Sequence, residues 1–222
     1  MQSTTPLSQG LLDLPAEIRI IIYSFLLICR SNSHVSIYHN STLTRNYTSH
    51  ITGLSRSIAI LRVCKLIQKE AAPVLYGSNK FVFCSMFFPN FLAQIGIKSV
   101  SLLREVELNC IIYQEGLGRG ARMLGSAVSM KKLTLGNDLW SPERPKLMAY
   151  TLWPMVKSLD AARKSKSCPT QTQTDVLEIL EFVQQVFSED QLRLPKEQAR
   201  DEAVNFTSQV REILRENLLL GA

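Results

Sequence analysis

The chain has few of the residues that metal centres, disulfide scaffolds and catalytic triads use. Its 222 residues include only three histidines, and its five cysteines form an odd set without a Cys-x-x-Cys pair. Common zinc sites need Cys or His pairs at short spacings, and Cys29 with His34, His39 and His50 matches none of these patterns, so we expect no metal. An odd set of free thiols is also more typical of a reducing compartment.

Long hydrophobic runs and a basic N-terminal segment are also missing. The most apolar stretch, Ile20 to Cys29, is interrupted by Ser24. It is much shorter than the ~20 residues that a membrane-spanning helix needs. Residues 1–10 contain neither a basic side chain nor an apolar run, so we expect no secretory signal or transit peptide. These absences predict an intracellular protein, cytoplasmic or nuclear, with no membrane partner.

Catalytic chemistry has little support in the sequence. The histidines lie in no catalytic motif, and only the glycine-rich segment Gly116 to Ser126 resembles a cofactor site. It follows a predicted strand and opens a predicted helix, a setting in which backbone N–H groups hold phosphate. Gly120 and Gly125 have P-loop spacing, but Ser126 stands where the phosphate-binding lysine belongs. We predict a strand-to-helix turn in a protein that is not an enzyme and has no cofactor, and a nucleotide-binding enzyme is the weaker alternative.

The charges present are modestly basic. The formal net charge is +6, and its densest cluster comprises Arg56, Arg62, Lys65 and Lys69. Such an excess suits an acidic protein partner or weak nucleic-acid contact, although a solvated helix face is the commoner explanation. We therefore expect no dedicated nucleic-acid function.

The first predicted helix is unusually apolar. It begins near Leu14 and Pro15, because proline is tolerated in the first helical turn, and Glu17 lies close to the positive end of the helix dipole. Two apolar faces follow at helical spacing, so the helix is either buried on both sides or partly available to a partner. The first face comprises Leu14, Ile18, Ile21, Ile22 and Phe25, and the second comprises Ile20, Tyr23, Leu26, Leu27 and Ile28.

A second helix is predicted after a polar segment. Residues 31–57 are rich in Ser, Thr, Asn and His, and Val35 to Tyr38 is their only strand-like piece. The helix then runs with apolar residues from Ile60 to Leu75 on one face. Pro73 is expected to kink or interrupt this helix, and Gly77 is expected to cap its C-terminus.

Strands and helices then alternate along the chain. The strands recur about every 25 residues, a spacing loosely like that of leucine-rich repeats, although the repeat consensus is absent. The predicted strands are Phe81–Phe83, Arg104–Ile112 and Lys132–Leu135, and the predicted helices are Pro89–Ile95, closed by Gly96, and Leu117–Val128.

The C-terminal part is predicted to be mainly helical, with helices at Leu147–Arg163 and Glu197–Leu220 and an ambiguous strand or helix at Val176–Val183. We therefore predict an α+β fold in which an N-terminal helical hairpin is followed by irregular strand-helix units and a C-terminal helix. The predicted regions are 11–83 with the polar insertion 31–57, the strand-helix units 84–136, and the helical subdomain 137–222.

Two segments resemble signatures of one family. Residues Leu11 to Tyr23 are similar to the opening helix of F-box domains, especially a large fungal group that begins LP-x-EIR-xx-IY. Residues Leu61 to Phe81 are similar to the second signature of that group, a VC-basic-xI helix that leads into LYG-x-N-x-F. Phe91–Gly96 and Leu103–Leu108 extend the similarity, which ends at about Leu135. The chain departs from the family in its 31–57 insertion and in Ile67, which replaces the usual Trp or Leu.

The resemblance implies a protein-protein interaction adaptor. F-box hairpins dock on the linker subunit of an SCF-type ubiquitin ligase, and the remainder of such proteins holds a protein substrate. Basic side chains at the docking surface would favour an acidic linker. The residues that the resemblance places at this surface are Leu14, Pro15, Ile18, Ile21, Ile22, Leu61, Arg62, Val63, Cys64 and Lys65.

Two other interpretations stay open at this point. Periodic apolar residues are usually core, so both helices of the hairpin can simply bury their apolar faces within this chain. Alternatively, the fold binds a protein partner as a scaffold that has no connection with ubiquitin. The coordinates distinguish the first of these from the adaptor interpretation, because a docking surface must be exposed.

Overall fold

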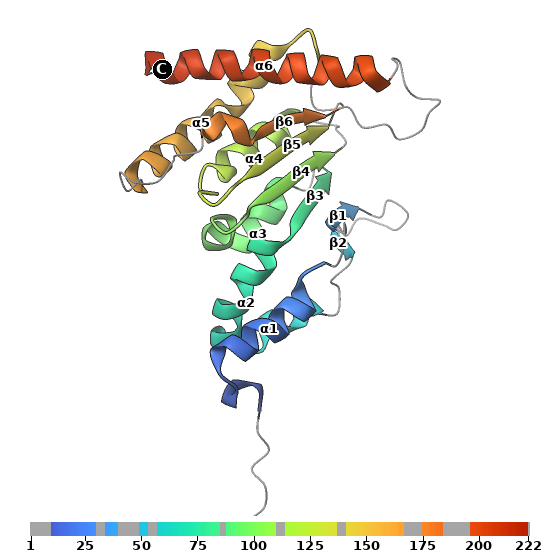
Figure 1. Cartoon of the computed structure of the whole chain (residues 1–222), viewed down its shortest axis with the longest axis vertical. Helices are drawn as coiled ribbons and strands as arrows, with labels where there is room; N and C mark the ends of the chain where they lie inside the picture. Colours follow the sequence, from blue (N-terminus) through green and yellow to red (C-terminus); the bar gives the residue numbers. More distant parts are fainter. Residues whose placement is uncertain are drawn as a thin grey trace, which may run out of the picture.

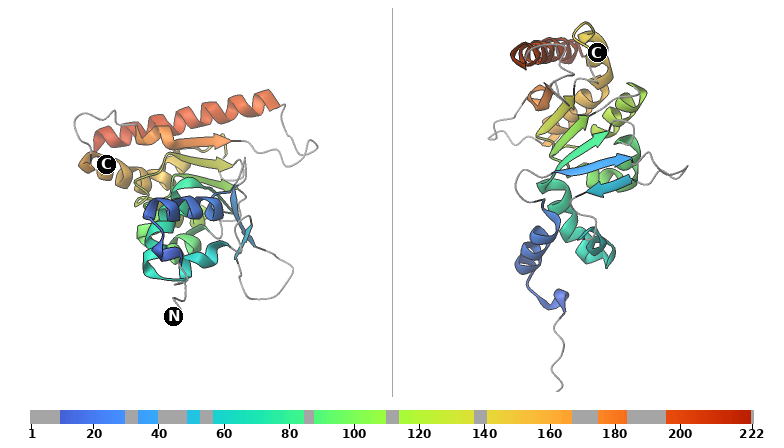
Figure 2. Two further views of the ribbon diagram at one scale, coloured as in Figure 1. Left: turned by 60° about the horizontal axis from the view of Figure 1, so that its bottom comes forward. Right: turned by 90° about the vertical axis from the view of Figure 1, so that its right-hand side faces the viewer.

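The computed structural model describes residues 10–29, 34–39, 49–52, 57–84, 88–109, 114–136, 141–166, 175–183 and 196–221. Within these ranges the chain is a mixture of helices and strands, as predicted. A helical hairpin lies at one end of the molecule, a sheet occupies the middle, and the long C-terminal helix lies at the other end (Figure 1). Figure 2 shows the same arrangement from two further directions.

The N-terminal hairpin consists of two α-helices, each preceded by a short 3-10 helix. The 3-10 helix η1 (Leu11–Asp13) leads into α1 (Ala16–Leu27), which starts near the predicted position but has Pro15 as its N-cap and not in its first turn. The second part comprises η2 (Ser57–Arg62) and α2 (Lys65–Ser78). Helix α1 packs on both α2 and η2.

The second part of the hairpin differs from prediction at both ends. The helical pattern that seemed to start at Ile60 is divided, because Cys64 has an extended backbone and caps a new helix from Lys65. Pro73 lies inside α2 without ending it, and Gly77 is also helical, with Asn79 as the C-cap. The apolar periodicity continues through the break at Cys64, so periodicity alone does not reveal it.

The sheet contains five parallel strands and one antiparallel strand. Its order is β2-β1-β3-β4-β5-β6, and β2 is the antiparallel strand, paired with β1. Strands β3 to β6 follow one another in chain order across the sheet. The bounds are β1 (Val35–His39), β2 (Ser49–Thr52), β3 (Lys80–Cys84), β4 (Glu105–Asn109), β5 (Lys132–Gly136) and β6 (Leu180–Val183).

The polar insertion contributes directly to this sheet. Strand β1 was predicted, but β2 was missed, because the sequence SHIT at 49–52 is short and contains only one large apolar residue. Strand β1 pairs with β3 in parallel, so residues between the two helices of the hairpin extend the central sheet. The sheet therefore contains strands from all three of the predicted regions.

One face of the sheet carries the core. Side chains alternate between the two faces of a strand, and the pairing register aligns the inward positions of all five parallel strands into two rows. Both rows are buried, which accounts for the apolar pattern of these short segments. One row comprises Val35, Phe81, Val106, Leu133 and Leu180, and the other comprises Ile37, Phe83, Leu108, Leu135 and Phe182.

The opposite face of the sheet carries charged side chains. Lys80 pairs with Glu107 on the next strand, and Lys132 pairs with Glu181 at 2.7 Å. Both pairs run diagonally between neighbouring parallel strands. These cross-strand pairs help to set the register, because a slip by one residue would turn the charged side chains into the core.

Helices connect the successive strands. They are α3 (Phe88–Val100), α4 (Gln114–Leu124) and α5 (Pro145–Lys166), and α3 and α4 lie behind the sheet in Figure 1. Parallel strands in chain order with right-handed crossovers place successive helices on the same face. Gly96 has a positive φ of 73° and ends the first part of α3 at the predicted position. The predicted alternation of strands and helices is confirmed. The loose similarity to leucine-rich repeats stays a prediction.

The C-terminal elements complete the edge of the sheet. The ambiguous segment at 176–183 is a 3-10 helix, η4 (Val176–Ile179), followed by β6. The last helix, α6 (Lys196–Leu220), was predicted almost to the residue. It packs against α5 and β6, and the Thr207 hydroxyl accepts a hydrogen bond from the Phe182 N–H at 3.3 Å. Helix α6 thus covers the edge strand of the sheet, which limits pairing with other chains.

Candidate partner-binding surface

A polar network joins the two helices of the hairpin. Arg19 on α1 forms a two-pronged contact with Glu70 on α2, with distances of 2.9 Å from Nε to Oε2 and 2.5 Å from Nη2 to Oε1. The Tyr23 hydroxyl donates to Glu70 Oε2 at 3.1 Å. Arg19 also donates to the Leu14 carbonyl at 2.5 Å, which fixes the turn before α1. The arginine of the EIR sequence therefore sets both the start of α1 and its orientation on α2.

The same contacts shift the pKa values of the groups involved. The guanidinium of Arg19 and the hydroxyl of Tyr23 donate to Glu70 and lower the pKa of its carboxyl group. Burial is the main cause of the raised pKa of Tyr23, and its hydrogen bond to Glu70 raises it further. Both directions favour an ionised Glu70 and a protonated Tyr23 at neutral pH.

Asn79 joins the C-terminal ends of the two helices. Its side chain is 4% exposed, and its Nδ2 donates to the carbonyls of Leu27 at 2.7 Å and Leu75 at 2.8 Å. Its Oδ1 accepts from the Cys29 N–H at 2.8 Å. One side chain thus satisfies backbone groups at the ends of both α1 and α2, which otherwise lack helical partners. This role explains an asparagine in the LYG-x-N-x-F sequence.

Because Arg19 and Tyr23 face α2, the opposite side of α1 faces outward. Ile18, Ile21 and Phe25 share this side at helical spacing and are 43%, 51% and 67% exposed. Single exposed apolar residues are normal on protein surfaces, but several on one helix face mark an interaction site. The interpretation in which both helices are fully buried in this chain's own core is therefore wrong for α1.

The structure places the ten predicted docking residues at the hairpin, but not all are equally accessible. In the turn between η2 and α2, Val63 is 66% exposed. The exposed members of the predicted set are Pro15, Ile18, Ile21, Arg62, Val63 and Lys65, and the partly buried members are Leu14, Ile22, Leu61 and Cys64. Leu61 and Cys64 pack against the core, so part of their predicted role is structural.

Sequence reasoning also missed residues that belong to this surface. Phe25 is the most exposed large apolar side chain of α1, and its place in the first apolar face was the available signal. The hairpin has four other exposed large apolar residues among those described that were not predicted for this surface, namely Leu12, Ile20 and Leu26 on η1 and α1, and Leu66 on α2. We call the exposed apolar residues of η1, α1, the η2–α2 turn and α2 the hairpin surface.

The glycine-rich segment has a different role from the predicted turn. Helix α4 begins at Gln114, so Gly118 and Gly120 lie within a helix and do not form a phosphate-binding loop. A Cβ atom on Gly120 would lie 2.3 Å from Cδ1 of Phe88 on α3, and one on Gly125 would lie 2.8 Å from the Cβ of Ser158 on α5. Close packing between neighbouring helices therefore accounts for these glycines, and the P-loop interpretation is wrong.

The described part of the chain has neither a metal-binding cluster nor a membrane-spanning helix. It contains no group of three or more His, Cys, Asp or Glu side chains that is suited to hold a metal ion. Across the same ranges, no helix combines the length and the apolar character needed to cross a membrane.

Cys29 is partly buried, and burial raises the pKa of its thiol, which makes it a weaker nucleophile.

Comparison with known proteins identifies no relative of this chain. No family model, no curated protein and no solved structure matches it. The interpretation of the hairpin surface therefore depends on its residues, their exposure and the two signatures.

Proposed function

We propose that this chain is an F-box-like adaptor that uses the hairpin surface to bind the linker subunit of an SCF-type ubiquitin ligase. The rest of the fold would hold a protein substrate, in the cytoplasm or the nucleus. The observation that carries this proposal is the outward row of Ile18, Ile21 and Phe25 on the helix that contains the LP-x-EIR sequence. No catalytic residue is required of the chain in this role.

The exposed apolar residues and the positive charge of the hairpin surface suit such an interface. A stable complex buries about 1,600 Å² in total, and a few apolar anchors supply most of its free energy. The exposed isoleucines and Phe25 are anchors of this kind. Arg62 and Lys65 are exposed beside Val63 and provide the positive charge that attracts an acidic partner.

The experiment is a binding measurement between the full chain and a purified SCF linker subunit. We expect the double substitution Ile18→Asp and Ile21→Asp to weaken binding at least hundredfold, because it introduces two charges into an apolar contact. Ile97→Asp is the matched control, because Ile97 is 71% exposed on α3, outside the hairpin. Circular dichroism and thermal melting should show that all variants remain folded.

One observation favours a second function, a protein-binding scaffold unrelated to ubiquitin. Strand β1, which lies between α1 and α2 in sequence, pairs with β3 in the central sheet. The hairpin is therefore tied into the rest of the fold, unlike an autonomous docking module. If the folded chain does not bind the linker subunit at all, the adaptor proposal is wrong, and the scaffold function is the one to pursue.

A further inference from the structure

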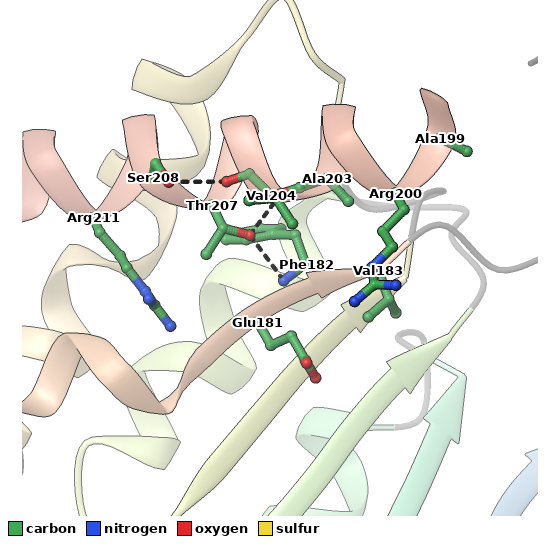
Figure 3. A pocket seen from close by; sticks show the side chains of 10 residues that line it. All are labelled: Glu181, Phe182, Val183, Ala199, Arg200, Ala203, Val204, Thr207, Ser208 and Arg211. Atoms are coloured by element: carbon green, nitrogen blue, oxygen red, sulfur yellow. Dashed lines mark hydrogen bonds between the residues drawn. The ribbon is translucent and has the colours of Figure 1, made fainter. Parts of the chain in front are cut away.

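A groove lies between α6 and the edge strand β6 (Figure 3), and these elements are at the opposite end of the molecule from the hairpin (Figure 1). Its volume is about 510 Å³, which is within the range of known ligand-binding pockets. Arg200 and Arg211 extend from α6 toward β6 and line the groove together with Val183, Val204 and Glu181 (Figure 3). We call this feature the α6 groove.

Within the described residues, no ion pair neutralises the positive charge of the α6 groove. Arg200 forms no ion pair or hydrogen bond with any other described residue. Among the described residues that line the groove, the one acidic residue is Glu181, which pairs with Lys132 at 2.7 Å and accepts from the Thr134 hydroxyl at 3.3 Å. Neither arginine thus has a carboxylate partner in the described part of the chain, so an anionic ligand would be favoured.

Arg211 is held in position but keeps an unused donor. Its Nη2 donates to the carbonyls of Leu180 at 2.6 Å and Glu178 at 3.2 Å. Its Nε is buried and has no hydrogen-bond partner within the described ranges. Because this atom is buried, a ligand in the groove meets only the accessible part of the Arg211 side chain, which lines the pocket. Because these contacts fix the side chain, a ligand would lose little free energy in ordering it.

The spacing of the two arginines indicates the kind of anion. They are eleven residues apart on one helix, which corresponds to about 16 Å along its axis. A compact anion does not reach both, whereas an extended chain covers this distance with about five residues. In an extended peptide, carboxylates four residues apart face the same side and lie about 13 Å apart, and the Arg200 side chain, which has no partner among the described residues, can bend to cover the remaining distance.

The remaining lining suits the side chains between two such carboxylates. Val204 is 59% exposed on α6, and Val183 provides further apolar surface. The outward backbone of β6 is already engaged, since the Phe182 N–H bonds to Thr207 and the Leu180 carbonyl bonds to Arg211. A peptide would therefore be held mainly by its side chains and not by adding a strand to the sheet.

We propose that the α6 groove binds an extended acidic peptide segment that has two carboxylates four residues apart. Arg200 binds one carboxylate and the accessible part of the Arg211 guanidinium group binds the other, while Val183 and Val204 contact the residues between them. This binding does not depend on the proposed ligase contact, because it uses the opposite end of the molecule.

Isothermal titration calorimetry of the full chain with synthetic nonapeptides tests this proposal. The probe is an acetylated and amidated peptide of serine and valine with glutamates at its third and seventh positions. A second peptide has glutamine at both positions, and a third has two adjacent glutamates. We expect the second and third peptides to bind at least tenfold more weakly than the first at low salt.

Charge reversal provides the matched variants. Arg200→Glu should weaken binding of the first peptide at least tenfold, and Arg122→Glu should change it less than threefold, because Arg122 is exposed on α4, outside the groove. Equal weakening by both variants would mean nonspecific attraction and would overturn the proposal. The proposal would also be overturned if the adjacent-glutamate peptide, or the compact anion citrate, bound as tightly as the first peptide. Absence of binding by the first peptide would overturn it too. No linker subunit is present, so these outcomes are independent of the adaptor test.

Discussion

Replacing Asn79 should weaken the connection between the two helices of the hairpin. Asn79→Ala removes three hydrogen bonds, two of them buried and one partly buried, and leaves the Leu27 and Leu75 carbonyls and the Cys29 N–H without this partner. A hydrogen bond contributes about 1 kcal/mol net, and a buried group that loses its partner costs about 1–3 kcal/mol. We therefore expect the free energy of unfolding to fall by about 2–4 kcal/mol.

Urea unfolding followed by circular dichroism measures this loss as a lower midpoint with an unchanged slope. Asn90→Ala is the control, because it makes the same chemical change at a residue that is exposed on α3. We expect it to lower the free energy of unfolding by about 0.5 kcal/mol or less. Asn79→Asp should cost more than Asn79→Ala, because a carboxylate oxygen replaces the Nδ2 donor and faces two carbonyls. If Asn79→Ala lies within 0.5 kcal/mol of wild type, the assigned role of Asn79 is wrong.

Two further predictions concern helix packing and pH. In the same urea experiment, Gly120→Ala should lower the free energy of unfolding by about 1–2 kcal/mol, because the added Cβ overlaps the buried Phe88 ring. Gly118→Ala is the control and should be neutral or stabilising, because the nearest atom to its Cβ is 3.8 Å away. Equal effects would contradict the packing role of Gly120. Arg19 lowers the pKa of Glu70 from its ordinary value near 4.5. The contact between Arg19 and ionised Glu70 therefore stabilises the fold above that value, and this stabilisation is lost as the pH falls through the lower pKa of the folded state. The melting temperature of wild type should therefore drop more between pH 6 and pH 3 than that of Glu70→Gln, and parallel curves would refute this coupling.

Local patterns predicted most of the regular elements. The 3.6-residue period identified α1 and α6, the aromatic and β-branched run identified β3, and the alternating leucines identified β5. These predictions succeed because periodicity records which side of an element faces the core, and this is a local property of the sequence. The break before Lys65 and the strand β2 were missed because they depend on capping and strand pairing between distant residues.

The glycines of α4 illustrate the same limit. A glycine-rich sequence after a strand is typical of a loop, and nothing local distinguishes that loop from a helix that must approach its neighbours closely. The deciding contacts are with Phe88 on α3 and Ser158 on α5, which are about 30 residues away in either direction. Only the packed helices show why Gly120 and Gly125 must lack side chains.

The sequence by itself determined that α1 is a helix with two apolar faces and an LP-x-EIR start, because spacing and capping residues are sufficient for this. Which face is buried was decided by tertiary structure alone. Hydrophobicity is similar on both sides, so it does not select between Ile21 and Tyr23. The partner of Arg19 is Glu70, 51 residues away, and this contact turns Tyr23 inward and leaves the isoleucines exposed.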